Sequence, residues 1–344
     1  MTGIGRASAV ALLGVTGRLV EVEAHLTSQL PAFTIIGLPD TSLGEARDRV
    51  RSAAANAGCP LPARRITVNL TPAAVPKRGS GFDLAIAMAV LAGADVAPLA
   101  SERTVYVGEL GLDGRTRPVV GIIPMLLAAR DAGVERVVVP TGNVDEARVV
   151  RGLTITGVSS LRAAAIDAGA ALPPVEVQPV QHAPALPPAP AQTPELADVL
   201  GNPVGVRALL AAAAGRHHVL LLGPPGAGKT MLAERLPGLL PDLGDEAALE
   251  VASVRSVAGL GDQSWTRRPP WEAPHHSASA IALIGGGSGT IRPGAVSRAT
   301  RGVLFLDEAG DTQRRRNATE SKHEGQEVGS LHTSITLDRG VRLG

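Results

Sequence analysis

Apolar and polar positions follow short, regular periods along the first half of the chain. Residues 19–24 (LVEVEA) alternate apolar and polar side chains, which is typical of a strand with one buried face. The preceding apolar run joins this strand through residues 15–18, so the pattern predicts a hairpin with Gly17 at the bend. Ile66, Val68 and Leu70 occupy alternate positions and predict the apolar face of a further strand.

Three other stretches carry apolar residues at the spacing of a helix. They cover residues 42–57, 82–91 and 122–132, and Gly58 followed by a proline ends the first. Apolar runs at 105–110 and in RVVVP predict additional strands. This mixture of elements predicts an α+β domain over residues 1–170.

A proline-rich segment, residues 171–194, interrupts these periods. It holds eight prolines and almost no charge, so it can form neither a helix nor a central strand, and we expect an extended linker. Beyond it, residues 204–214 have helical spacing and Val219–Leu222 form a short apolar strand. We therefore expect two domains joined by a linker, the second an α/β P-loop domain over residues 195–309.

The strongest chemical signal directly follows this second strand. Residues 223–230 read GPPGAGKT and fit the pattern G-x-x-x-x-G-K-[ST] at every constrained position. Such a loop between a strand and a helix directs backbone N–H groups at one anion, and glycines let the backbone approach it closely. We expect Lys229 to reach the β and γ phosphates of ATP and Thr230 to bind Mg²⁺. The predicted ATP-binding residues are Gly223, Pro224, Pro225, Gly226, Ala227, Gly228, Lys229, Thr230 and Met231.

A second apolar strand, residues 302–308 (GVLFLDE), ends in two carboxylates. Because both of its faces are apolar, we place it inside a covered sheet. Its acidic end then lies at the carboxyl edge, where α/β sheets bind ligands. We expect Asp307 to hold the water shell of Mg²⁺ and Glu308 to polarise the attacking water.

Three features between these two strands give weaker signals. His275 and His276 are adjacent, and adjacent side chains in a strand point to opposite faces, so a structural role is favoured over metal binding. The glycine run at 285–289 predicts a flexible loop. Arg292 and Arg298 nearby are a weak electrostatic hint of nucleic-acid contact.

Composition narrows the function classes. Lysine and arginine number 33 against 32 aspartates and glutamates, so the net charge of +1 gives no case for a polyanion partner. The only cysteine, Cys59, cannot form an internal disulfide, which suits a reducing cytoplasm. No apolar run approaches the length of a membrane span, so we expect no membrane anchor. With aromatic residues at 2%, a base-stacking platform for single strands is not expected.

These motifs together resemble the ComM/YifB family of magnesium-chelatase-like AAA+ proteins. The resemblance runs across residues 9–309 and implies an N-terminal domain with the fold of the Lon protease domain, followed by an AAA+ ATPase module. It further implies an ATP-driven hexameric motor on DNA that assists branch migration during recombination. The matching segments are GVTGRLVEVEAHL, FTIIGLPD, RVRSAAANAG, RRITVNLTPA, GFDLAIA, VGELGLDG, GPPGAGKTMLA, APHHSAS, ALIGGG and GVLFLDE.

The resemblance to Lon raises the question of peptidase activity, which there requires a serine nucleophile and a lysine base. Alignment places Gly81 at the nucleophile position, one residue beyond Ser80, and Ile123 at the lysine position. We therefore expect a non-catalytic interaction or assembly domain and no protease. Asp83, at the start of a predicted helix, is expected to cap or support the N-terminus of that helix.

Several positions depart from the family pattern. Residues 271–274 (WEAP) replace a family Phe-Arg, and Ala295 replaces a family Glu. From residue 310 onward the family continues with a sensor strand, an arginine finger and a lid, whereas residues 310–344 contain too few apolar side chains for a core. We therefore expect a module that is incomplete at its C-terminus and a disordered tail, by frameshift, premature stop or altered gene boundary.

The missing sensor strand has a predicted physical cost. As the resemblance implies, that strand lies between the strand before the phosphate loop and the acidic strand. Without it both neighbours would expose backbone edges, ATP binding would weaken, and turnover would be nearly absent. The leading hypothesis is a hydrolysis-defective AAA+ ATPase of this family. The alternatives are a magnesium-chelatase-type motor subunit and a non-enzymatic interaction module formed by the N-terminal domain.

Overall fold

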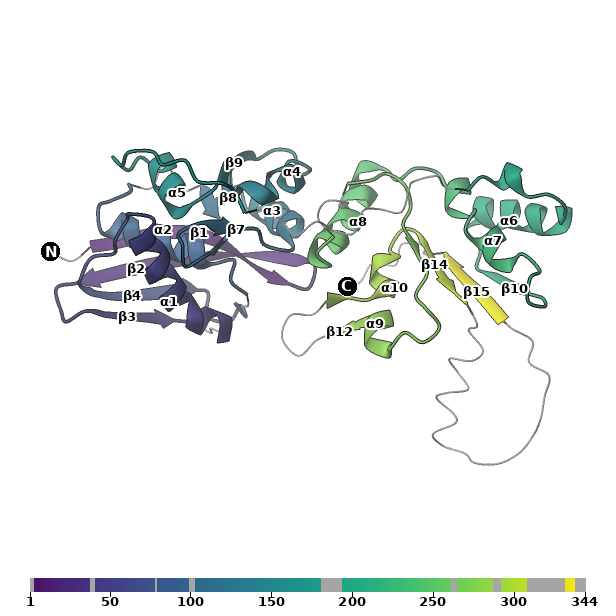
Figure 1. The fold of residues 1–344 in the computed structure, drawn as a ribbon, viewed down its shortest axis with the longest axis horizontal. Helices are drawn as coiled ribbons and strands as arrows, with labels where there is room; N and C mark the ends of the chain where they lie inside the picture. Colours follow the sequence, from purple (N-terminus) through teal and green to yellow (C-terminus); the bar gives the residue numbers. More distant parts are fainter. Residues whose placement is uncertain are drawn as a thin grey trace, which may run out of the picture. The chain divides into compact units, whose positions relative to one another are not determined.

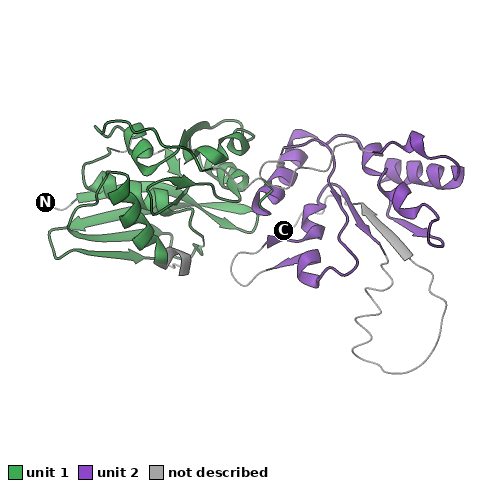
Figure 2. Cartoon of the chain, in the orientation of Figure 1, with its two compact units in different colours: residues 1–187, 259–264 green, residues 188–258, 265–344 purple. Residues whose placement is uncertain are grey.

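The computed structural model describes residues 3–37, 41–77, 79–98, 103–180, 194–260, 265–286, 292–307 and 332–337. It divides into two compact units (Figure 2). Unit 1 comprises residues 1–187 and 259–264, and unit 2 comprises residues 188–258 and 265–344. Each unit contains both helices and strands, so the chain belongs to the mixed α/β class (Figure 1). None of the described helices is long and apolar enough to cross a membrane.

Unit 1 is built on a seven-stranded mixed sheet with the order β3-β4-β2-β1-β5-β8-β9. The β1–β2 hairpin and the β2–β4 pair are antiparallel, whereas the pairs β3–β4, β1–β5, β5–β8 and β8–β9 are parallel. The strands are β1 (Gly3–Leu13), β2 (Thr16–Thr27), β3 (Ala32–Ile36), β4 (Arg65–Thr71), β5 (Thr104–Tyr106), β8 (Arg136–Pro140) and β9 (Thr154–Val158).

The hairpin turns at residues 14–15, so its glycine is Gly14, three residues before the predicted Gly17. Gly14, with φ of +60°, occupies the turn, whereas Gly17 lies inside β2 opposite Leu12. A Cβ at Gly17 would lie 2.7 Å from the Cβ of Ala128, so this glycine is needed for close helix packing rather than for the bend.

Helices cover both faces of this sheet. The predicted helices are present as α1 (Thr41–Asn56), α2 (Asp83–Gly93) and α3 (Ile122–Asp131), and α4 (Val144–Ala147) and α5 (Leu161–Asp167) follow. Side chains of α1, α2 and α5 share one buried core with Val20 and Val22 of β2. Gly17 lies at odd spacing from those valines and meets α3, so α3 packs on the opposite face.

The predicted strand at 105–110 is divided in the structure. β5 ends at Tyr106, and β6 (Glu109–Leu110) pairs instead with β7 (Thr116–Arg117) in a separate ribbon. Between them the N–H of Gly108 donates to the carbonyl of Gly81 at 3.0 Å, which draws the backbone away from the main sheet. A 3₁₀ turn, η1 (Thr141–Asn143), follows β8.

Unit 2 contains a four-stranded sheet with the order β10-β15-β14-β11 and a small β12–β13 ribbon. β11 and β14 are parallel, and β15 is antiparallel to both of its neighbours. In chain order the elements are η2 (Leu196–Asp198), α6 (Pro203–Gly215), β10 (Val219–Leu222), α7 (Lys229–Ala233), η3 (Pro237–Leu239), α8 (Asp245–Val257), β11 (Trp271–Glu272), α9 (Ala280–Ile284), β12 (Gly285–Gly286), β13 (Arg292–Pro293), α10 (Ala295–Arg298), β14 (Val303–Leu306) and β15 (His332–Leu337).

Strand β15 corrects an expectation from the sequence. The segment 310–344 was expected to hold no ordered element, yet residues 332–337 form a strand between β10 and β14 (Figure 1). Its backbone pairs with residues 219–222 on one side and 303–306 on the other, so the facing edges of β10 and β14 are not exposed. Scarce apolar residues do not exclude a strand, because the segment HTSITL is rich in β-branched residues.

The two faces of β10 differ in cover. Val219 and Leu221 pack on a buried cluster that includes Leu209 of α6. Leu220 and Leu222, on the other face, are 56% and 60% exposed. Unit 2 therefore has one well-covered face at this strand, whereas a strand that is apolar throughout is typical of a sheet covered on both faces.

Candidate nucleotide-binding site

The loop after β10 adopts a conformation that requires glycine. Gly226 and Gly228 have φ of +80° and +81°, in the left-handed region that other residues rarely adopt. No other side-chain or backbone atom lies within 4 Å of a Cβ placed at Gly226, so the space beside the loop is open. The loop leads directly into α7, which begins at Lys229. The left-handed backbone conformation explains both glycines, and at Gly226 it is joined by open space for an anion.

Lys229 lies at the rim of this loop. Its Nζ donates hydrogen bonds to the carbonyl oxygens of Gly223 at 2.9 Å and Pro224 at 3.0 Å. The side chain is half-buried, and the adjacent Thr230 is exposed. An ammonium held only by two carbonyls can exchange them for phosphate oxygens, which carry full charge. Helix α7 ends at Ala233, and Pro237 follows one turn later.

The acidic strand ends at the same edge of the sheet as the loop. Since β15 is antiparallel to both β10 and β14, those two strands are parallel to each other. Leu220 and Leu306 both pair with Ser334, so the two strands are level. Asp307, half-buried, directly follows β14, two strand spacings or about 10 Å from the line of β10. Glu308 lies outside the described residues.

The paired histidines form a local turn. Their ring centroids are 4.0 Å apart, and the N–H of Ser277 donates to Nδ1 of His275 at 3.3 Å. Among the described residues no group of three His, Cys, Asp or Glu side chains could hold a metal ion. Of the predicted glycine run, residues 285 and 286 form β12, and residues 287–289 lie outside the described residues.

Arg298, a weak nucleic-acid candidate in the sequence, has an internal partner. Its Nε and Nη2 donate to one carboxylate oxygen of Glu272 at 3.1 and 2.9 Å. Arg292 is exposed. Next to Glu272, Trp271 stacks on Phe305 with ring centroids 5.3 Å apart. The positions that depart from the family pattern thus make structural contacts, which sequence spacing alone did not reveal.

In unit 1, Ser80, next to the position aligned with the Lon nucleophile, and Ile123, at the position aligned with the Lon lysine, have other environments. The hydroxyl of Ser80 donates to the carboxylate of Glu109, and Ile123 is fully buried. Lys77, also buried, donates to the carbonyl of Pro72, and burial lowers the pKa of its ammonium. Neither of these two hydrogen bonds joins a lysine to Ser80, as a Ser-Lys dyad would require.

Asp83 lies in the first turn of α2, as the sequence predicted, but its side chain makes no capping hydrogen bond. Its carboxylate accepts hydrogen bonds from Nε of Arg49 at 2.7 Å, from Nη2 of Arg49 at 3.1 Å and from the N–H of Leu110 at 3.2 Å. The side chain is fully buried. Burial raises the pKa of Asp83 to about 6, and the bonds from Arg49 oppose this rise. The residue joins α1, α2 and β6 rather than completing the helix terminus.

Comparison with known proteins gives matches over both units. The family model described as "Magnesium chelatase, subunit ChlI" matches residues 195–332, and the model "Subunit ChlI of Mg-chelatase" matches residues 22–143. An uncharacterized protein of Mycobacterium tuberculosis is 49% identical over 318 residues, which cover 90% of this chain and 61% of the relative. The competence protein ComM of Haemophilus influenzae is 44% identical over 309 residues, covering 89% and 60%.

YifB, an uncharacterized protein of Escherichia coli, is 41% identical over 336 residues, which cover 95% of this chain and 63% of the relative. A weaker similarity links the chain to the Lon protease of Rhizobium meliloti, 30% identical over 197 residues, 54% of this chain and 24% of the protease. The chain belongs to the ComM/YifB family of magnesium-chelatase-like proteins. It spans about three-fifths of the length of these family relatives.

Proposed function

We propose that unit 2 binds ATP with Mg²⁺ at the loop Gly223–Thr230. The observation that carries this proposal is the pairing of a left-handed glycine loop, open at Gly226, with an ammonium at its rim and a carboxylate on a level, parallel strand. The site residues Gly223–Met231 would surround the phosphates. Thr230 and Asp307 would hold Mg²⁺, which supplies charge neutralisation when bound, and Glu308 would polarise the attacking water.

The position of each group in the structure determines what it would contribute to ATP binding. Lys229 would leave the carbonyls of Gly223 and Pro224 and neutralise phosphate charge. Backbone N–H groups at the start of α7 would face the same phosphates. Asp307 would orient metal-bound water from the neighbouring strand. Membership of the family supports a wider proposal, that of a DNA-associated, ATP-driven motor which assembles as a hexamer and works in the cytoplasm in branch migration.

We further propose that this 344-residue chain binds ATP better than it hydrolyses it. In the family pattern the strand between β10 and β14 ends in a sensor asparagine. Here β15 runs antiparallel and brings its first residue, His332, opposite Leu222 at the phosphate edge. The start of a strand, rather than a sensor at its end, therefore lies beside the nucleotide. Lower transition-state stabilisation and slow turnover would follow.

The direct test is binding of Mg²⁺ and a fluorescent ATP analogue to the full chain. Lys229→Ala removes a charge-assisted contact to phosphate and should weaken affinity about 10- to 100-fold. Arg207→Ala, on the exposed face of α6, removes the same charge elsewhere in unit 2 and should leave affinity unchanged. Equal affinity in the wild type and Lys229→Ala would contradict the proposed site.

Turnover is tested separately with ATP, with and without DNA. The proposal predicts nucleotide binding with little phosphate release under either condition. Phosphate release at ordinary AAA+ rates that is abolished by Lys229→Ala would overturn the impaired-turnover proposal and leave the binding site intact.

Two alternatives rest on other observations. The names of the matching family models favour a magnesium-chelatase-type motor, and metal insertion into a porphyrin with partner subunits would establish it. The continuous buried core of unit 1 favours an interaction module that works without ATP. A proteolytic fragment of unit 1 alone would favour the module, whereas a fragment extending to residue 307 and protected further by ATP would count against it.

A further inference from the structure

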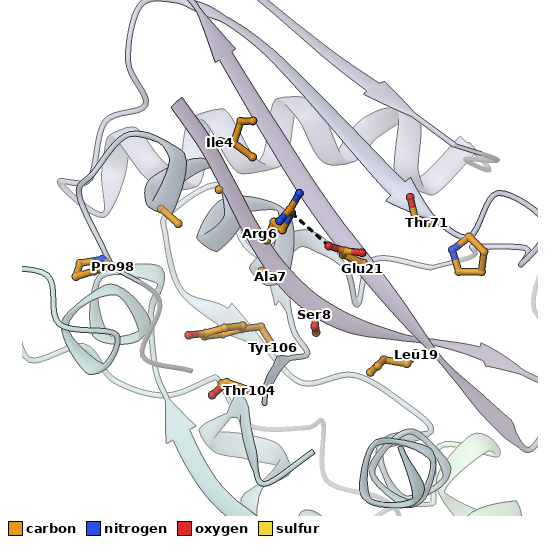
Figure 3. A pocket seen from close by; sticks show the side chains of 13 residues that line it. Ile4, Arg6, Ala7, Ser8, Leu19, Glu21, Thr71, Pro98, Thr104 and Tyr106 are labelled. Carbon is orange, nitrogen blue, oxygen red and sulfur yellow. Dashed lines mark ion pairs between the residues drawn. The ribbon is translucent and has the colours of Figure 1, made fainter. Parts of the chain in front are cut away.

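Unit 1 contains a pocket of about 910 Å³ where β1 and β5 separate (Figure 3). β1 pairs with β2 along its whole length, from Gly3 to Leu13, but it pairs with β5 only at Ser8. On the edge that faces away from β2, the segment 3–7 therefore has no strand partner among the described residues. Four of these five residues, 4–7, line the pocket, so an unpaired strand edge faces into it.

Two buried hydroxyls lie on the β5 side of the same pocket. Tyr106 is 1% exposed and Thr104 is 3% exposed, and neither hydroxyl has a hydrogen-bond partner. Leaving a buried polar group without a partner is unfavourable, so such groups point to a missing ligand. Burial, with a smaller effect from Asp167, raises the pKa of Tyr106 to about 12. The phenol is therefore protonated at neutral pH and can donate.

The charges at the pocket are already paired. Arg6 contacts Glu21 at 3.4 Å across the hairpin (Figure 3). It also contacts Glu23, outside the pocket lining, at 3.0 Å. The rest of the wall carries no charge and combines Leu19 and Pro98 with the hydroxyl side chains of Ser8 and Thr71. Paired charges, a neutral wall and isolated hydroxyls favour an uncharged ligand that carries its own polar backbone.

The strand edge is also held in place. A Cβ at Gly3 would lie 1.9 Å from the carbonyl oxygen of Gly93, and a Cβ at Gly5 would lie 2.1 Å from that of Ala89. Strand β1 therefore packs tightly against α2. A fixed edge loses little conformational freedom when a partner pairs with it. Ala92 lines the pocket near the carboxyl end of α2, whereas the loop aligned with the Lon nucleophile precedes the amino end. No described residue of that loop lines the pocket, although Pro72, whose carbonyl accepts a hydrogen bond from Lys77 of the loop, does.

We propose that this pocket binds an extended, uncharged peptide segment of a partner protein, which adds as a strand along residues 3–7. The segment would supply backbone N–H and C=O groups at the strand repeat, which a small molecule does not carry, and would offer a polar group to the hydroxyls of Tyr106 and Thr104. Residues 99–102, which connect Pro98 towards β5, lie outside the described residues, and the site is defined without them. The proposal does not depend on nucleotide binding by unit 2.

The test starts from a displayed library of random nine-residue peptides selected on the full chain without ATP. Recovered peptides are synthesised in two forms, unmodified and N-methylated at alternate backbone amides, and their affinities are measured by fluorescence polarisation. We expect uncharged sequences, and at least a 10-fold loss on methylation because ladder hydrogen bonds are removed. Tyr106→Phe and Thr104→Val should each weaken binding about 3- to 10-fold.

Thr27→Val is the matched control, since the Thr27 hydroxyl is also buried without a partner but does not line the pocket. It should bind as the wild type does, and circular dichroism should show all three variants folded. Equal binding of methylated peptides, or affinities insensitive to Tyr106→Phe and Thr104→Val, would overturn the proposal. Self-association of the chain that both substitutions abolish would assign the edge to a second copy and also overturn it.

Discussion

Strands β4 and β10 carry similar apolar side chains but differ in what covers them. Leu70 of β4 is fully buried, whereas Leu222 of β10 is 60% exposed. In unit 1, helices α1, α2 and α5 close one continuous core over the sheet. In unit 2, α6 and α7 cover one face of β10 and leave its two other leucines open. An apolar run therefore predicts a strand, but its burial depends on what packs against it.

The two sheets also differ in how their central strands are joined. β1 and β2 form a hairpin with a two-residue connection, so their pairing is local. Among the described strands, β10 and β14 are joined only through β15, which lies more than 100 residues beyond β10 in the chain. Non-local pairing pays a larger loop-closure entropy. Unit 1 is thus self-contained, whereas the sheet of unit 2 depends on one distant strand.

Intrinsic probes separate the two units. Both tryptophans, Trp265 and Trp271, belong to unit 2, so their fluorescence reports its unfolding. The only cysteine, Cys59, is buried in the core of unit 1, so labelling of its thiol in urea reports opening of that core.

The largest effect is expected from Arg49→Ala in unit 1. This change leaves the fully buried carboxylate of Asp83 without its cation, which should cost roughly 3–5 kcal/mol at pH 7. The matched control is Arg47→Ala, because Arg47 pairs with Asp48 on the surface, where water screens the pair, and its loss should have a much smaller effect. Cys59 labelling in urea measures the loss of stability of unit 1 in both variants. Equal effects would show that the buried pair does not stabilise the core.

A leucine in each sheet tests the difference in cover. Leu70→Ala should destabilise unit 1 by about 2–5 kcal/mol, because it leaves a cavity in a closed core. Leu222→Ala should change the stability of unit 2 by less than about 1 kcal/mol, because its side chain is mostly in water. Cys59 labelling in urea gives the change in stability of unit 1, and tryptophan fluorescence in urea gives the change in stability of unit 2. A large loss for Leu222→Ala would mean that its face is covered in solution.

The role of β15 is tested by Ile335→Pro. Residue 335 pairs with Val219 and with Phe305, so removing its N–H from the middle of a central strand should cost about 3 kcal/mol. Tryptophan fluorescence should show unit 2 unfolding at lower urea, and Cys59 labelling should not change. An unaltered tryptophan transition would show that β15 does not hold β10 and β14 together.

The smallest effect expected is a dependence of unit 1 on pH. The pKa of Asp83 is about 6 in the folded chain against 3.8 in an unfolded one, so the folded state binds the proton more tightly. Stability contributed by this group is greatest below pH 3.8 and declines as pH rises towards 6, by at most about 3 kcal/mol. Asp83→Asn should remove this slope between pH 4 and 7 in Cys59 labelling experiments. A slope identical in the variant would assign it to other groups.

The sequence predicted the local elements because their signals are local. The alternation at 66, 68 and 70, the helical spacing of α1 and the loop motif before Lys229 each depend on neighbouring residues. The turn at Gly14 was missed since two glycines near the bend fit the pattern, and only packing against Ala128 distinguishes them.

Long-range features could not be predicted from spacing. The bond from Arg49 to Asp83 joins residues 34 positions apart, and the bond from Arg298 to Glu272 joins residues 26 apart. The position of β15 depends on two edges that other segments create, so its own polar composition gave no sign of it. The unpaired edge of β1 depends on where β5 ends, which no pattern in either strand determines.

Hydrogen exchange of the full chain, followed by mass spectrometry with and without Mg²⁺ and ATP, tests whether unit 2 binds nucleotide at the loop after β10. We expect slow exchange in β1, β2 and β4 under both conditions. We expect faster exchange in β10 and β14, and slowing by nucleotide confined to residues 223–233 and the adjacent ends of β10 and β14. Nucleotide-dependent protection absent from residues 223–233, or located instead in unit 1, would contradict binding at this loop.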